Sequence, residues 1–91
     1  MRQRGQNMSA VAINYDKDFD VLYVRPYTKE SVYGDEDDFG VVTLRRMDDD
    51  SVAGMIVYDF KQQCGDGTLD LHCLPIPIDA SIPEIQKILH P

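Results

Sequence analysis

Apolar and polar residues alternate along much of the chain, and a period of two is typical of a β-strand with one face toward a core. The alternation begins at Ser9, after an N-terminal stretch that has no periodicity. Alternation, or a run of β-branched and apolar residues, predicts strands over 9–15, 21–27, 39–45, 52–60 and 68–74, with a short extended piece at 31–33. Acids and glycines between these stretches predict turns, including a loop that begins at Gly34.

The fourth predicted strand differs from the others because it is apolar on both faces. Met55 and Val57 lie on one side of it. Ile56, Tyr58 and Phe60 lie on the other side. Two apolar faces favour a strand in the middle of a sheet or one buried at an interface.

The C-terminal end of the chain changes to a helical pattern. One apolar stripe at helical spacing runs through Ile82, Ile85, Ile88 and Leu89. Ser81, with Glu84 three residues later, forms a capping box, and Pro83 is tolerated in the first helical turn. The sequence therefore predicts a helix over 81–89, preceded at 61–67 by a turn or a short helical linker.

These elements predict an α+β fold, with an antiparallel sheet of four to five strands, built as a hairpin and meander, and one short C-terminal helix. With 91 residues the chain is long enough for one small domain. We expect residues 1–8 to be a disordered arm and residues 9–91 to form a single domain. Within it, residues 61–91 are a strand–helix extension.

Charge and composition narrow the classes of function. Sixteen acids against nine bases give a formal net charge of −7. Such a surface repels the phosphate backbone, so no direct nucleic-acid binding is expected. No apolar run is long enough to span a membrane, and the polar N-terminus lacks the apolar core of a signal peptide. The sequence predicts a cytoplasmic protein without a membrane partner.

Two acidic runs, at 35–38 and 48–50, offer carboxylates for a divalent cation. A calcium or magnesium site would require oxygen ligands at alternating loop positions, a glycine turn between them and a bidentate acid later in the loop. Consecutive acids point in divergent directions, which favours solvated loops and predicts neither a metal nor a cofactor. A divalent-metal-binding protein, or a metal-assisted enzyme that combines these acids with His72, remains an alternative.

The two cysteines, Cys64 and Cys73, match none of the short zinc or redox spacings. In a reducing cytoplasm they are expected to be free thiols, with Cys73 partly buried. Asp70 and His72 would share one face of the predicted strand over 68–74, and Cys73 would face the other way. That geometry argues against a cysteine–histidine dyad, and no catalytic residue is predicted.

Residues 15–24 carry the most specific motif, Tyr-Asp-Lys-Asp-Phe-Asp-Val-Leu-Tyr-Val. The motif resembles the Tyr-Asp-three residues-Asp-x-Leu-Tyr signature of the small DUF2283 proteins. Residues 40–42, 48–50 and 52–56 resemble later strands and a turn of that family, so the resemblance covers about 12–60. Two departures are Ser51, where glycine is usual, and the pair Arg45 and Arg46 ahead of the acids.

The resemblance implies a small β-rich domain, and the chain after residue 60 lies outside the usual module. Because the DUF2283 family has no established activity, no catalytic or cofactor-binding residue is carried over. Asp side chains are natural turn residues, so Asp16 and Asp20 are expected to hold the connection between two strands. The signature residues expected to be structural are Tyr15, Asp16, Asp20, Leu22 and Tyr23.

The apolar patterns leave one surface without a partner, because one short helix cannot cover both faces of a sheet. A homodimer that pairs the open face is therefore predicted. Tyrosines can form cross-strand aromatic pairs on such a sheet, and the ones expected to lie near one another are Tyr23, Tyr27, Tyr33 and Tyr58. The predicted function is a small non-enzymatic protein-binding or regulatory module. An acidic mimic of nucleic acid is a further alternative.

Overall fold

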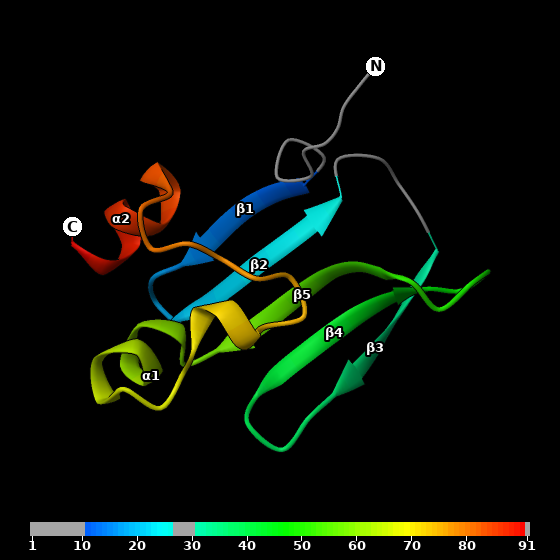
Figure 1. Cartoon of the computed structure of the whole chain (residues 1–91), viewed down its shortest axis with the longest axis horizontal. Helices are drawn as coiled ribbons and strands as arrows, with labels where there is room; N and C mark the ends of the chain where they lie inside the picture. The colour runs from blue at the N-terminus through cyan, green and yellow to red at the C-terminus, as the bar shows by residue number, and fades with distance from the viewer. Residues whose placement is uncertain (1–10, 27–30, 91) are drawn as a thin grey trace.

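The computed structural model describes residues 11–26 and 31–90 and contains one five-stranded antiparallel sheet and two short α-helices (Figure 1). The strands are β1 (Val11–Asp16), β2 (Val21–Pro26), β3 (Val32–Glu36), β4 (Val41–Arg46) and β5 (Val52–Tyr58). The helices are α1 (Phe60–Asp66), a single 3₁₀ turn η2 (Leu71–Cys73) and α2 (Pro83–Leu89). The predicted α+β class, antiparallel sheet and short C-terminal helix are confirmed. The predicted arm at 1–8 lies outside the described residues.

The sheet joins a hairpin to a meander, in the order β1-β2-β5-β4-β3. β1 and β2 form the hairpin, and β3, β4 and β5 follow one another as the meander. β5 links the two parts by pairing antiparallel with β2, with Leu22 opposite Val57. β5 therefore lies in the middle of the sheet, which its two apolar faces predicted.

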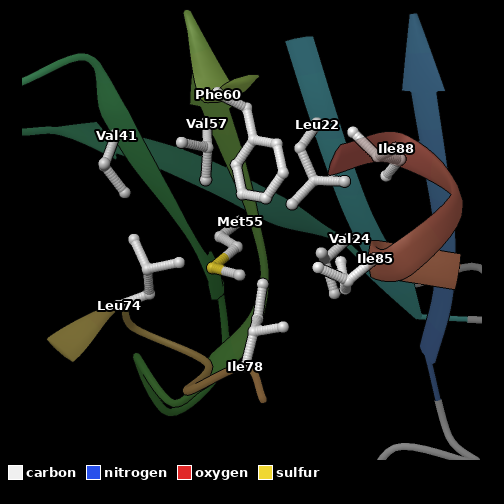
Figure 2. Packing of buried hydrophobic residues seen from close by; sticks show 10 residues of the cluster. All are labelled: Leu22, Val24, Val41, Met55, Val57, Phe60, Leu74, Ile78, Ile85 and Ile88. Carbon is white, nitrogen blue, oxygen red and sulfur yellow. The ribbon is translucent and has the colours of Figure 1, made fainter. Parts of the chain in front are cut away.

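The hydrophobic core lies on one face of this sheet. The side chains that form it come from β2, β4, β5, α1 and the chain that follows α1, and they are Leu22, Val24, Val41, Met55, Val57, Phe60, Leu74, Ile78, Ile85 and Ile88 (Figure 2). Figure 1 shows α1, the segment that follows it and α2 on the same side of the sheet. Removing these apolar side chains from water is the main favourable contribution to folding.

The fifth predicted strand, over 68–74, is wrong. The chain there forms η2, and the Asp70 carboxylate accepts a hydrogen bond from the His72 N–H at 3.0 Å. A short local bond of this kind competes with extended backbone. Pro75 and Pro77 cannot donate to a β-ladder, so pairing could not continue beyond them. The segment instead directs Leu74 into the core.

The loop predicted to begin at Gly34 is also wrong, because Gly34, Asp35 and Glu36 belong to β3. Glu36 lies opposite Val42 at the end of the β3–β4 pair. β3 is an edge strand, where acidic side chains are tolerated and discourage pairing with another chain. The turn begins after Glu36, at Asp37, three residues later than predicted.

Two boundary predictions near the helices need correction. The predicted strand over 52–60 ends at Tyr58, and Phe60 begins α1 with its side chain on the same face as Met55. The left-handed backbone of Asp59, with φ 53°, separates the end of β5 from the start of α1. The predicted capping box is absent at α2, where Ile82 is the N-cap and makes no side-chain bond.

Candidate functional site

The β1–β2 turn carries the signature acids, and Asp16 shapes it. Asp16 Oδ1 accepts hydrogen bonds from the N–H of Asp18 at 3.0 Å and of Phe19 at 3.3 Å. An aspartate that bonds its own backbone two residues later holds the chain in a turn. The Asp16 side chain is therefore occupied by the local backbone.

Asp20 connects the hairpin to helix α1. Its Oδ1 accepts from the Tyr15 hydroxyl at 2.6 Å and from the Lys61 N–H at 2.7 Å. Its Oδ2 accepts from the Gln62 N–H at 3.0 Å, and its carbonyl oxygen accepts from the Phe60 N–H at 3.0 Å. The first N–H groups of a helix have no partner within the helix. Asp20 supplies those partners.

This contact replaces the usual N-cap of α1. The residue at that position, Asp59, makes no side-chain capping bond. Asp20 adopts a left-handed backbone with φ 56°, a conformation that Asp tolerates better than most residues. The acid that caps α1 therefore comes from a turn about 40 positions earlier in the chain.

The pKa shifts at this contact determine which of the two groups, Asp20 or Tyr15, carries the proton. Burial alone would raise the pKa of Asp20, but hydrogen bonds from the Tyr15 hydroxyl and from the Lys61 and Gln62 N–H groups outweigh it and lower that pKa below 3.8. Burial, and then the bond to Asp20, raise the pKa of Tyr15 to about 12. Near neutral pH Asp20 is an ionised acceptor and Tyr15 a neutral donor.

The remaining signature residues point to opposite faces of the sheet. Leu22 is fully buried in the core. Tyr23 lies on the other face, with the Arg25 guanidinium 5.0 Å from its ring centroid. The Tyr15 ring packs edge-on against Phe60, with ring centroids 6.4 Å apart. Together these contacts hold the hairpin against α1 and against the rest of the sheet.

Asp20→Ala is expected to lower the free energy of unfolding by about 1–3 kcal/mol, since it removes a helix cap worth ~1 kcal/mol and a tyrosine hydrogen bond worth ~1 kcal/mol. Urea unfolding followed by circular dichroism measures the change. Asp18→Ala in the same turn is the matched control and should change stability by less than about 0.5 kcal/mol. Equal effects of the two substitutions would rule out the capping role.

Lowering the pH provides a second test of the stabilising role of the Asp20 carboxylate. Because its folded pKa is depressed, ionised Asp20 stabilises the fold at pH values above 3.8, its ordinary pKa, and that stability is lost as pH falls through the folded pKa. The difference in unfolding free energy between wild type and Asp20→Ala should therefore shrink as the solution is acidified. A difference that does not change with pH would mean that the carboxylate charge is not involved.

The turn η2 brings together three side chains that the sequence placed on opposite faces. The Cys73 thiol donates to Asp70 Oδ2 at 3.3 Å, and His72 Nδ1 lies 4.0 Å from Asp70 Oδ1. Cys73 is exposed rather than partly buried. The bond to Asp70 and its negative charge raise the pKa of the Cys73 thiol. A raised pKa keeps the thiol protonated and makes it a poor nucleophile.

A shallow cleft lies beside this group, between the β3–β4 turn and the segment that leads into η2. Its volume is about 240 Å³. Its lining is mostly apolar and includes Phe39, Val41, Leu69, Cys73 and Leu74. Asp37 at its edge uses Oδ1 to accept from the Phe39 and Val41 N–H groups at 2.7 and 3.0 Å.

Several acids of the two predicted acidic loops are engaged by neighbours. Asp49 Oδ1 accepts from the Ser51 N–H and hydroxyl at 2.9 and 2.7 Å. Asp50 Oδ1 accepts from the Tyr33 hydroxyl at 2.7 Å, and Asp35 lies 3.4 Å from Arg45 Nε. Across residues 11–26 and 31–90, no group of three or more His, Cys, Asp or Glu side chains gathers where it could hold a metal ion.

The second face of the sheet has no helix over it in the part of the chain that the structure describes (Figure 1). Side chains alternate between faces along a strand, so the neighbours of the core residues point this way. Those in the middle of the face are only partly buried, and they are Tyr23, Val42, Leu44 and Ile56. The register places Tyr23 opposite Ile56, and Ile56 opposite Val42, across three adjacent strands.

The predicted cluster of four tyrosines does not form as a group. Tyr33 pairs with Arg45, so it lies on the core side of β3. Tyr58 lies on the uncovered side, opposite Val21, and is 42% exposed. Tyr27 falls outside the described residues. The uncovered face therefore carries a mixture of aliphatic and tyrosine side chains and has no ladder of aromatic rings among the described residues.

No family model, curated protein or solved structure matches this chain. The resemblance to DUF2283 proteins therefore stays a prediction from the motif at 15–24. Among the described residues, no helix is both long enough and apolar enough to cross a membrane.

Proposed function

We propose that this protein is a small, non-enzymatic, cytoplasmic binding module of the DUF2283 type that docks its uncovered sheet face on a protein. A single observation carries the proposal, the apolar middle of that face at Tyr23, Val42, Leu44 and Ile56. Contiguous apolar surface of this kind gains free energy when a partner removes it from water. Both helices lie on the other side of the sheet, so no helix of residues 11–26 and 31–90 covers this face.

Four titratable groups with shifted pKa values are poorly suited to general acid–base catalysis, which is compatible with a binding role. A general acid or base works best when its pKa lies near the pH of the medium. The pKa of Asp20 and Asp70 is lowered, and that of Tyr15 and Cys73 is raised. All four shifts run away from neutral pH. The metal-assisted alternative and the nucleic-acid mimic have no comparable observation in their favour.

The proposal is tested by Ile56→Lys, which puts a charge in the middle of the face. We expect this variant to keep its fold and to lose at least tenfold in affinity for any protein that binds the face, or about 1.4 kcal/mol. The measurement compares proteins retained from native-cell extract by immobilised wild type and by the variant. Circular dichroism and a thermal melt check that the variant is folded.

Phe19→Lys is the matched control, because Phe19 is 75% exposed in the β1–β2 turn and lies off the face. It should retain the same partners as wild type. Partners that bind Ile56→Lys as well as they bind wild type would contradict the proposal.

A further inference from the structure

The cleft beside η2 plays no part in the docking role proposed for the uncovered face of the sheet. It lies on the other side, at the margin of the core, where Val41 and Leu74 line it. Its volume is about 240 Å³. A cavity of about 150 Å³ holds a benzene ring, and sites for drug-sized ligands begin at about 300 Å³. The cleft is therefore the right size for one aromatic or aliphatic side chain.

One wall of the cleft is the β3–β4 turn, and hydrogen bonds hold its backbone in place. Asp37 accepts from the N–H groups of Phe39 and Val41. From α1, the Gln63 side-chain amide donates to the Phe39 carbonyl at 3.3 Å and to the Tyr58 carbonyl at 2.8 Å. The Phe39 side chain is 76% exposed at this rim. Because its backbone is already ordered, covering the ring with a ligand costs less conformational entropy.

The opposite wall, from Thr68 through η2, is held in the same way. The Thr68 N–H donates to the Gln63 carbonyl at 3.0 Å, and the Cys73 N–H donates to the Asp70 carbonyl at 3.0 Å. The Asp70 carboxylate accepts from the His72 N–H and from the Cys73 thiol. Both walls are thus formed before any ligand arrives, which favours binding.

The charges that line the cleft are negative. Asp37 and Asp70 are part of the lining, and none of the described residues that line it is a lysine or an arginine. The nearest arginine on β4 is Arg45, four residues beyond Val41, which is about 13 Å along the strand. Arg45 is also paired with Asp35, at 3.4 Å. An apolar cleft with acids at its edge attracts a ligand that is apolar and cationic.

Two other basic side chains near the cleft do not belong to its lining. Lys61 lies two residues before Gln63 in α1, about 200° round the helix, and its positive charge acts on Asp20. His72 Nδ1 lies 4.0 Å from Asp70 Oδ1, outside the lining. A pH of about 8 keeps imidazole side chains neutral, so measurements at that pH leave the charge of Asp70 uncompensated by His72.

We infer that this cleft is a second binding site, which takes one aromatic or aliphatic side chain from a basic peptide segment of another protein. The apolar side chain fills the space between Phe39 and Leu74. Lysine or arginine side chains next to it in the segment lie at Asp37 and Asp70. Nucleic acids and anionic lipid surfaces are repelled by the same carboxylates.

Selection of short random peptides on phage against the immobilised full chain tests the inference, because display in several copies retains weak binders. The enriched peptides should combine an aromatic or aliphatic residue with lysine or arginine. Synthetic copies are then measured by fluorescence anisotropy at about pH 8, and a Kd of about 10–500 µM is expected. Raising the salt from about 50 to about 500 mM should weaken binding about threefold or more.

Variants of the lining locate the peptide. Phe39→Ser should weaken binding at least about fivefold. Phe19→Ser is the matched control, because Phe19 is equally exposed but lies outside the lining, and it should bind like wild type. Thr68→Lys adds a cation to the lining without removing a carboxylate, so it should weaken binding about three- to tenfold and reduce the salt effect. Thermal melts establish that each variant is folded.

The thiol of Cys73 gives an independent readout, since it is exposed and lines the cleft. A saturating peptide should slow its alkylation several-fold, as followed by mass spectrometry. The partly buried Cys64 is the internal reference, because it is not part of the lining.

The inference is overturned if no peptide is enriched, if the enriched peptides lack basic residues, or if Phe39→Ser binds them as tightly as Phe19→Ser does. Unchanged alkylation of Cys73 at saturation would place the peptide elsewhere and would also overturn it. Ile56→Lys, on the uncovered face, should bind the peptides like wild type. Loss of binding in that variant would exclude the cleft and leave the proposed docking role of the face intact.

Discussion

Phe60→Ala is expected to lower the free energy of unfolding by about 3–5 kcal/mol, the cost typical of truncating a fully buried aromatic side chain. The Phe60 ring has no exposed surface and lies where the sheet meets α1 (Figure 2). Its neighbours include Tyr15, whose ring packs edge-on against it. Small domains are stable by only about 5–15 kcal/mol, so this loss is a large part of the total.

Equilibrium unfolding in urea measures the effect of Phe60→Ala at neutral pH. Phe19→Ala is the control, because that side chain is 75% exposed, and it should change stability by no more than about 0.5 kcal/mol. A similar loss in both variants would show that burial on this face is not the main source of stability.

Gly54→Ala is expected to destabilise the fold by about 2–3 kcal/mol through overpacking. A Cβ at this position in β5 would collide with the Val24 carbonyl oxygen and would lie 3.3 Å from Arg25 Cα and Leu44 Cδ1. The first obstacle is backbone of the neighbouring strand, which cannot move without disturbing the β2–β5 pair. The gain of about 0.4–1 kcal/mol from a stiffer unfolded chain does not offset this cost.

Gly65→Ala provides a comparison of opposite sign. Gly65 lies in α1, and nothing within 4 Å would meet its Cβ. Alanine is about 1 kcal/mol better than glycine inside a helix, so this variant should be more stable than wild type by up to about that amount. Thermal melts of the two variants should move in opposite directions. A shared direction would remove the steric explanation for Gly54.

Gly54 also bears on the proposed docking surface. Leu44 Cδ1 lies close to the position that a Gly54 Cβ would occupy, so the missing side chain lets Leu44 lie across β5 toward β2. That close approach makes the apolar middle of the face continuous between strands that are not direct neighbours. Gly54→Ala is therefore expected to disturb the face as well as the fold.

The repeating patterns of the sequence determined the class of fold. Alternation marked β1 and β2, β-branched residues marked β4, and the two apolar faces of β5 indicated its place in the middle of the sheet. The helical stripe placed Ile85 and Ile88 in the core. These features are readable because strand and helix periods depend on residues that are near one another in the chain. Because the sequence predicted only one short helix, it also indicated that one face of the sheet would stay uncovered.

Tertiary structure alone decided that Asp20 caps a helix, that residues 32–36 become a strand and that residues 68–74 do not. Asp20 was expected to hold a turn, and it caps a helix that begins about 40 positions later. β3 is a strand because β4 offers it a ladder, although Gly34, Asp35 and Glu36 favour loops by local preference. The segment at 68–74 alternates like a strand but finds no partner, and a local bond from Asp70 sets η2 instead. Each of these outcomes depends on contacts between residues far apart in the chain, which no local pattern records.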